Sequence, residues 1–203
     1  MRLSPRFEAA LRYAVDVHRG QLRPGTAIPY IAHPLAVCAI VLEAGGDEDQ
    51  AIAGLLHDAA EDQGGARRLR DIGERFGERV ETIVKGCTDS LEQPRPPWRL
   101  RKERYLSHLR QAPADELLVA LADKLHNARA VLNDYRALGD RVWERFEGGR
   151  DYASWYQAEL AAVFRERLPG PLATEMSDLV DRIRSAGSAG QLTLGDDPVE
   201  RRA

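Results

Sequence analysis

The chain has 203 residues, of which 43% are hydrophobic and 30% charged, and this composition suits one globular domain long enough to bury a core. Its formal net charge of −3 excludes a general electrostatic attraction to nucleic acid or to an anionic membrane surface. No signal-peptide pattern occupies the first ten residues and no apolar stretch approaches the roughly 18 residues of a membrane span. We therefore expect a cytoplasmic protein with neither a membrane nor a nucleic-acid partner.

Helices are predicted throughout the first half of the chain, because apolar residues recur there at spacings of three and four. Glycine and proline mark where these helices begin and end. The expected helices cover residues 5–18, about 33–44, 47–61, a short segment with Leu69, Ile72 and Phe76, and another from Val80 to near Gly86. The segment 19–32 contains two glycines and two prolines and is expected to be a loop.

The second half of the chain is also predicted to be helical. A loop over residues 88–97, with three prolines, precedes a strongly basic helix. The expected helices cover residues 98–111, 113 to 132 or 138, 152–168, and 171 to about 184. We find no internal repeat and no strand pairing. The prediction is one all-α domain over residues 1–186, followed by a flexible tail over 187–203.

The most informative segment is His57-Asp58-Ala59-Ala60-Glu61-Asp62, which follows the apolar run 51–56. On a continuous helix, His57 and Glu61 share one face, and so do Asp58 and Asp62, because each pair is four residues apart. This much charge at the end of a buried segment needs compensation, and a metal ion can supply it. The His-Asp dipeptide alone is a weak signal, so a metal site also requires distant partners.

Four residues are candidate metal ligands: His33, His57, Asp58 and Asp123. Imidazole and carboxylate donors suit a borderline divalent ion such as Mn²⁺, Fe²⁺ or Zn²⁺, and water bound to such an ion becomes a nucleophile. Spacing alone leaves alternatives open. His33 could cap a helix, Asp58 could lie at the surface, and Asp123 could pair with an arginine in the core.

Three blocks of sequence resemble a known family. They are His18-Arg19-Gly20-Gln21-Leu22-Arg23 leading into Pro29-Tyr30-Ile31-Ala32-His33-Pro34, then Leu55-Leu56-His57-Asp58-Ala59-Ala60-Glu61-Asp62, then Leu121-Ala122-Asp123-Lys124-Leu125-His126-Asn127-Ala128-Arg129. With these blocks in this order, the chain resembles the HD-domain metal-dependent phosphohydrolases. Within that family it is similar to the hydrolase half of RelA/SpoT-type proteins and to the small alarmone hydrolases. The resemblance covers about residues 5–165 and implies a single compact all-α HD-domain fold.

The resemblance also implies a reaction. In this family the 3′-pyrophosphate is removed from guanosine tetra- or pentaphosphate, which gives GDP or GTP and pyrophosphate. A single metal ion, usually Mn²⁺, is held by residues that match His33, His57, Asp58 and Asp123. The implied partner is therefore a small nucleotide, while a homo-oligomer is left open.

Four further residues acquire roles from the resemblance. Glu61 and Asp62 match the pair that activates and orients the attacking water. Arg23 matches a basic residue beside the substrate, and Asn127 matches a contact to the nucleotide sugar. Glu61 lies one turn beyond His57, so its carboxylate can reach a metal-bound water without being a ligand, and a positioned general base contributes roughly 10² to 10⁴ in rate.

Two departures from the family pattern leave the substrate's base open. Arg23 is followed by Pro24 where a basic pair is common, and Ala130 stands where bifunctional relatives often carry a hydroxyl residue. The alternatives are hydrolysis of an adenosine alarmone, NADPH or a deoxynucleotide, and a non-catalytic nucleotide-binding module. Because 203 residues leave no room for a synthetase domain, we expect a protein with hydrolase activity alone.

Other conspicuous side chains are expected to be structural. Cys38 and Cys87 should be buried free thiols, and His18 should brace the loop that follows it. The remaining structural assignments are His108, His126 and the packing residues Tyr152 and Tyr156. The basic cluster is expected to be a solvated helix face rather than a site for a polyanion, and consists of Arg95, Arg99, Arg101, Lys102 and Arg104.

Overall fold

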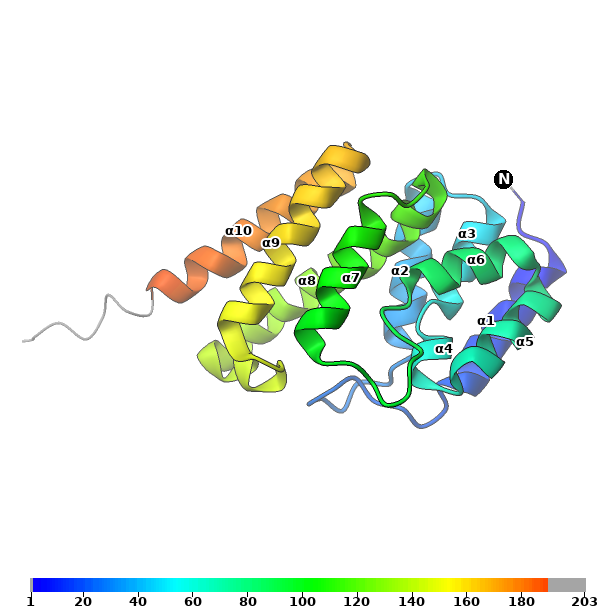
Figure 1. Ribbon diagram of the computed structural model, residues 1–203, viewed down its shortest axis with the longest axis horizontal. Coiled ribbons are helices and arrows are strands. Elements are labelled where there is room, and N and C mark those ends of the chain that lie inside the picture. The colour runs from blue at the N-terminus through cyan, green and yellow to red at the C-terminus, as the bar shows by residue number, and fades with distance from the viewer. Residues whose placement is uncertain (1, 190–203) are drawn as a thin grey trace, which may run out of the picture.

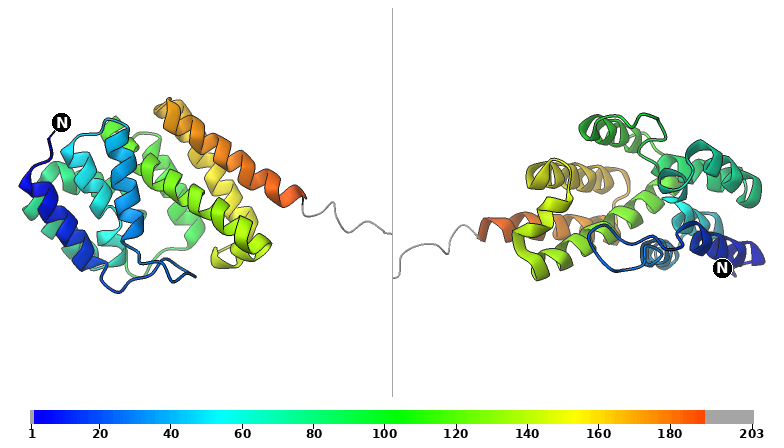
Figure 2. Two further views of the ribbon diagram at one scale, coloured as in Figure 1. Left: turned by 180° about the vertical axis from the view of Figure 1, so that it is seen from behind. Right: turned by 90° about the horizontal axis from the view of Figure 1, so that it is seen from below.

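The protein is an assembly of helices, seen in a computed structural model that describes residues 2–189 (Figures 1 and 2). The elements in chain order are α1 (Pro5–Val17), α2 (Ala32–Glu43), α3 (Glu48–Leu56), α4 (Ala59–Asp62), α5 (Gly65–Phe76), α6 (Glu78–Cys87), α7 (Trp98–Leu109), α8 (Ala114–Leu138), the 3-10 helix η1 (Gly139–Arg145), α9 (Gly149–Arg167) and α10 (Pro171–Ala189). The only pairing outside helices among the described residues is an isolated antiparallel bridge between Leu22 and Pro29. The predicted all-α class is confirmed.

The core is built around α3 and α8. Every residue of α3 from Gln50 to Leu56 is buried, and α8 buries a continuous run from Val119 to Asp123. Helices α2 and α6 pack on both of these central helices, and α1 packs on α3. At the opposite end from α1 and α5, the pair α9 and α10 packs against α8 (Figure 1). Helix α8 therefore connects the two ends of the molecule.

A glycine allows α2 and α3 to approach closely. A Cβ atom added to Gly54 would lie 3.2 Å from the Cα and 3.4 Å from the backbone nitrogen of Cys38 in α2. Cys38 and Cys87 are buried and unpaired, as predicted. No helix among the described residues is long and apolar enough to cross a membrane.

The predicted continuous helix over 47–61 is wrong at one point. Helix α3 ends at Leu56, His57 and Asp58 form a turn, and α4 begins at Ala59. The Nδ1 atom of His57 lies 2.9 Å from the carbonyl oxygen of Gly54 and must donate to it, because a carbonyl oxygen only accepts. In an unbroken helix that oxygen accepts from the amide of Asp58. A side-chain hydrogen bond has replaced a backbone one, which interrupts the helix.

Three smaller differences concern two helix ends and one additional helix. The basic helix α7 stops at Leu109 rather than 111, and η1 was not predicted at all. Helix α10 continues to Ala189, beyond its expected end near residue 184. The rest of the predicted tail, residues 190–203, lies outside the described residues.

Candidate functional site

Four of the predicted site residues meet where four helices, α2, α3, α4 and α8, come together. His33 lies in the first turn of α2, His57 and Asp58 link α3 to α4, and Asp123 lies in the middle of α8. The Nε2 atoms of His33 and His57 are 3.2 Å apart. Oδ2 of Asp58 lies 3.4 Å and 3.0 Å from these two atoms, and Oδ1 of Asp123 lies 3.1 Å and 3.7 Å from them. We call these residues the His-Asp cluster.

The spacing of the His-Asp cluster fits a metal ion. Ligand atoms about 2.1 Å from an ion are about 3.0 Å apart at right angles and about 3.4 Å apart at tetrahedral angles. The observed separations span 3.0 to 3.7 Å. A search of the described residues for groups able to hold a metal ion finds three cluster members, His33, His57 and Asp58. The fourth member, Asp123, approaches both imidazoles from α8.

The electrostatics of the His-Asp cluster also favour a bound cation. Burial disfavours charge on His57, but Asp58 and Asp123 outweigh burial and raise its pKa well above the ordinary value. Burial likewise raises the pKa of Asp58, yet the contact with His57 brings it well below the usual carboxyl range. A buried site that recruits a proton when no ion is present is one that accepts positive charge.

Hydrogen bonds behind the two imidazoles set their orientation. Because Nδ1 of His57 donates to the carbonyl of Gly54, its Nε2 faces the cluster and is the nitrogen that a metal ion would bind in place of a proton. The Nδ1 atom of His33 lies 2.7 Å from Nδ1 of His126. Burial and the neighbouring His33 lower the pKa of His126 to about 4, so its neutral ring can accept the proton of His33. His126 was expected to be purely structural, but its contact is with a cluster residue.

The two carboxylates of the cluster are also held by neighbouring side chains. Asp58 Oδ2 accepts a hydrogen bond of 2.6 Å from the hydroxyl of Tyr30. Asp123 accepts from Asn127 Nδ2 at Oδ1 and from Lys124 Nζ at Oδ2, each at 2.6 Å. The core arginine considered as a partner of Asp123 is thus replaced by a lysine. Tyr30 and Lys124 stand inside the sequence blocks quoted above, although neither was assigned a role.

Glu61 and Asp62 project from α4 beside the cluster. Glu61 Oε2 accepts from the backbone N–H of Asp89 at 3.2 Å, and Oε1 accepts from Arg95. Burial, followed by the charges of Asp89 and Asp58, raises the pKa of Glu61 to about 7. Asp62 accepts from Gln21 Nε2 at 2.7 Å, and burial and Asp58 raise its pKa as well. Glu61 is thus poised between its two protonation states near neutral pH.

A buried aspartate in the loop 88–97 organises the basic segment. The Asp89 side chain is 5% exposed and accepts from Lys102 at 2.7 Å, from Arg95 at 3.1 Å and from Arg101. Burial raises the pKa of Asp89, but these cations outweigh burial and lower it to about 2. The prediction of a solvated helix face is therefore wrong for Arg101 and Lys102. Pairings between a loop and a helix leave no periodic signal in the sequence.

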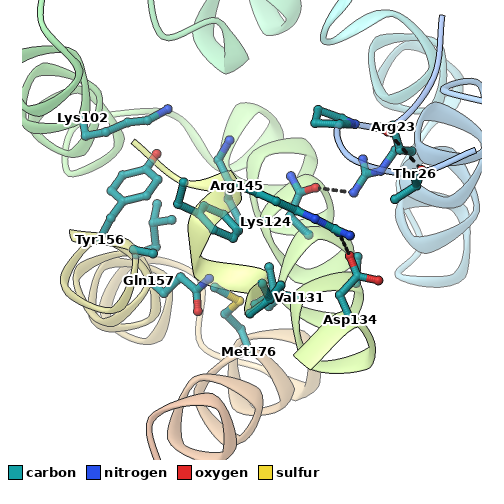
Figure 3. A pocket seen from close by; sticks show the side chains of 18 of the residues that line it. Arg23, Thr26, Lys102, Lys124, Val131, Asp134, Arg145, Tyr156, Gln157 and Met176 are labelled. Atoms are coloured by element: carbon teal, nitrogen blue, oxygen red, sulfur yellow. Dashed lines mark hydrogen bonds and ion pairs between the residues drawn. The ribbon is translucent and has the colours of Figure 1, made fainter. Parts of the chain in front are cut away.

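A cavity of about 410 Å³ adjoins the cluster residue Asp123 through Lys124 and Asn127 (Figure 3). Arg23 lines the same cavity, and its guanidinium donates to Asn127 Oδ1 at 3.0 Å. The structure thus brings both predicted substrate-binding residues together. The size is typical of pockets for small molecules.

Cationic and apolar groups divide the lining of this cavity. Its basic residues are Arg23, Lys102, Lys124 and Arg145, and its larger apolar residues are Ile28, Trp98, Val131, Val142, Phe146, Leu160 and Met176. Arg145 is neutralised by Asp134, 2.7 Å away, whereas no carboxylate of the lining is paired with Arg23. Such a cavity suits a ligand that combines phosphate groups with a flat, weakly polar part.

Comparison with known sequences identifies relatives of the chain. The family model described as "HD domain" matches residues 10–150. The chain is 37% identical over 123 residues to the guanosine-3′,5′-bis(diphosphate) 3′-pyrophosphohydrolase of Xenopus tropicalis. This alignment covers 59% of this chain and 66% of that protein. The chain is also 37% identical over 127 residues to the GTP pyrophosphokinase of Streptomyces coelicolor. That alignment covers 62% of this chain and 14% of the relative. The chain thus spans just under two thirds of the first relative and a small part of the second.

Comparison with solved structures gives a consistent result. A metazoan orthologue of SpoT, described as hydrolysing ppGpp, aligns over 90% of this chain and 97% of its own with a TM-score of 0.74 and 24% identity. A protein of Listeria monocytogenes EGD-e aligns over 78% of this chain and 99% of its own with a TM-score of 0.66 and 31% identity. The first similarity concerns the fold alone. Because the HD-domain family model matches more than half of the 203 residues, the chain belongs to the HD-domain family.

Proposed function

We propose that the protein is a metal-dependent hydrolase that removes the 3′-pyrophosphate of guanosine tetra- or pentaphosphate and yields GDP or GTP and pyrophosphate. The observation that carries this proposal is the convergence of two imidazoles and two carboxylates beside a cationic cavity. The name of the Xenopus tropicalis relative supports the choice of substrate.

The His-Asp cluster is the proposed metal site, with Mn²⁺ as the proposed ion. Its four residues supply two nitrogen and two oxygen donors, a mixture that suits a borderline divalent ion. A divalent ion bound there supplies Lewis acidity, which lowers the pKa of water and polarises a phosphoryl oxygen. The contacts from Gly54 and Asn127 hold the donors in place before the ion binds.

Glu61 is the proposed general base, and Asp62 orients the attacking water. A base with a pKa of about 7 is largely able to accept a proton slightly above neutral pH and to release it again. Arg95 donates to Oε1 of Glu61 and the backbone N–H of Asp89 donates to Oε2. Two groups of the loop 88–97 therefore hold the Glu61 carboxylate in its orientation. Gln21 holds Asp62 through its Oδ2 atom.

Arg23 and Asn127 are the proposed substrate contacts. The hydrogen bond between them joins the loop before α2 to α8, and Asn127 in turn reaches Asp123. A substrate that meets Arg23 is thereby placed at a fixed distance from the cluster. Arg23 also lies over the ring of Tyr30, with 5.9 Å between its guanidinium carbon and the ring centroid, which restricts its orientation.

A substrate panel tests the proposed function. Mn²⁺-loaded protein is incubated with guanosine tetraphosphate, guanosine pentaphosphate, an adenosine alarmone, NADPH and a deoxynucleotide, and the products are separated by chromatography. We expect pyrophosphate and GDP or GTP from the guanosine alarmones. Release from a different substrate alone would replace the proposed one. Binding without release from any of them would favour a nucleotide-binding module.

The proposed location is the cytoplasm. Cys38 and Cys87 are buried as free thiols, which is typical of a reducing compartment. The proposed partner is the small nucleotide substrate. We propose neither a nucleic acid nor a membrane as a partner.

A further inference from the structure

A buried hydroxyl group in the cavity wall has no hydrogen-bond partner. Tyr156 of α9 is 9% exposed and lines the cavity, yet its Oη atom has no partner among the described residues. Leaving a hydroxyl group buried and unpaired is unfavourable by about 1–3 kcal/mol. Unpaired buried groups of this kind are uncommon in folded proteins and call for a ligand or another explanation. Tyr156 also lies beyond residues 10–150, which match the HD domain.

Two ammonium groups share this part of the cavity with Tyr156. Lys102 Nζ is 5.0 Å from the centroid of the Tyr156 ring, and Lys124 lines the same cavity from α8. Figure 3 shows the ends of Lys102, Lys124 and Tyr156 directed toward a common region of the cavity. The three side chains come from α7, α8 and α9, so the fold brings them together from separate segments.

Each of the two lysines pairs with one carboxylate, Lys102 with Asp89 and Lys124 with Asp123, but Asp89 also pairs with Arg95 and Arg101. Positive charge around Asp89 therefore exceeds negative charge. Burial, followed by the charge of Lys124, lowers the pKa of Lys102, although the hydrogen bond to Asp89 opposes this effect. Burial also raises the pKa of Tyr156, so its hydroxyl group keeps its proton and can donate. An anion here would relieve the repulsion between the two lysines and give the hydroxyl group an acceptor.

We propose that Lys102, Lys124 and Tyr156 form a binding site for a phosphate group of the nucleotide, with the Tyr156 hydroxyl donating to a phosphate oxygen. The identity of the nucleotide rests on the proposed function, whereas the chemistry of the site does not. Both the released pyrophosphate and the retained 5′-diphosphate have the required oxygens. In this arrangement α9 contributes a ligand contact that the motifs of the HD domain do not contain.

Tyr156→Phe tests the site, because it removes the hydroxyl group and keeps the ring. Tyr105→Phe is a matched control: Tyr105 is 3% exposed, its hydroxyl group is also buried without a partner, and Lys124 Nζ lies 5.1 Å from its ring, but it does not line the cavity. Calorimetry measures the binding of inorganic pyrophosphate and of GDP to the metal-free full chain. A hydrogen bond to a charged group corresponds to about a tenfold change in affinity or more.

We expect Tyr156→Phe to weaken binding of at least one probe about tenfold, and Tyr105→Phe to leave both affinities unchanged. Loss for pyrophosphate alone assigns the site to the released group, and loss for GDP alone assigns it to the retained diphosphate. Unchanged affinity for both probes in Tyr156→Phe would overturn the proposal. Failure of the unsubstituted chain to bind either probe would overturn it too.

Thermal unfolding without ligand distinguishes a ligand-binding role of the Tyr156 hydroxyl group from a structural role. Both Phe variants should unfold at the same temperature as the unsubstituted chain or higher, because each removes a buried, unpaired hydroxyl group. A clear drop in Tyr156→Phe alone would mean that the hydroxyl group has a structural partner and would contradict the proposal. None of these measurements requires turnover. A chain that binds the probes through Tyr156 and yet hydrolyses no nucleotide would retain the phosphate site and lose the proposed function.

Discussion

Single carboxylates near the cluster differ in charge because their surroundings differ. Asp58 lies between two imidazoles, and its pKa is held well below the usual range. Glu61, three residues later, is buried near the carboxylates of Asp58 and Asp89, and its pKa rises to about 7. Neighbouring acids with such different proton affinities can divide the work of binding a cation and of moving a proton.

Glu61→Gln should separate these two roles. The amide cannot accept a proton, so turnover should fall by about 10² to 10⁴ while the metal content is unchanged. In the unsubstituted protein, turnover should decline as the pH falls through about 7, because Glu61 becomes protonated there. Elemental analysis measures the metal, and a pH-rate profile measures the decline. Full turnover in Glu61→Gln would remove Glu61 as the base.

Arg95→Gln tests the cause of that pH dependence. Arg95 opposes the carboxylates of Asp89 and Asp58 around Glu61, so its removal should raise the pKa of Glu61 and move the decline to higher pH. Arg104→Gln is the control: Arg104 belongs to the same basic segment, but pairs with the exposed Glu92. A shift of the same size in both variants would point to overall charge rather than to the contact with Glu61.

At the scale of helices, the close approach of α2 and α3 matters for the geometry of the site. Helices α2 and α3 carry His33 and lead to His57, and the Nε2 atoms of these residues are 3.2 Å apart. That separation depends on Gly54, where α3 crosses the backbone of Cys38. The glycine therefore permits the close approach of α2, which carries His33, and α3, which leads to His57.

Gly54→Ala should weaken both the fold and the site. The added methyl group would lie 3.2 Å from the Cα of Cys38, and such overpacking is unfavourable by about 1–3 kcal/mol, more than the gain of up to about 1 kcal/mol from replacing a helical glycine. Urea unfolding and metal titration measure the two effects. Gly170→Ala is the control, because nothing lies within 4 Å of its added methyl group. Metal affinity equal to that of the control would show that α2 and α3 tolerate the separation.

The elements also show what periodicity can and cannot predict. Helices such as α1 and α8 follow from apolar residues at spacings of three and four, because one face of each is buried. The break at His57 was missed because it arises from a side chain that takes the carbonyl of Gly54. The ion pairs of Asp89 were missed for a related reason: they join a loop to α7, and no local pattern encodes them.

On the scale of the whole molecule, the site spans most of the described chain. The three motif blocks predicted which histidines and aspartates would meet, because a metal site requires specific residue types. The far wall of the cavity comes from η1, α9 and α10, where Tyr156, Leu160 and Met176 carry no recognisable motif. Their position depends on how α9 and α10 pack against α8, which is a property of the tertiary structure.

Metal binding should stabilise the entire molecule, since the proposed ligands come from α2, the turn between α3 and α4, and α8. An ion at 100 times its dissociation constant adds about 2.7 kcal/mol to the free energy of unfolding. For a protein of this size that corresponds to a rise of about 5–10 °C in unfolding temperature. Adding Mn²⁺ to chelator-treated protein and recording thermal unfolding measures the rise. Asp58→Ala removes one donor from the shared site, so the same addition should leave its unfolding temperature nearly unchanged. An equal rise in Asp58→Ala and in the unsubstituted chain would mean that the ion binds elsewhere and that the helices are not joined through the cluster.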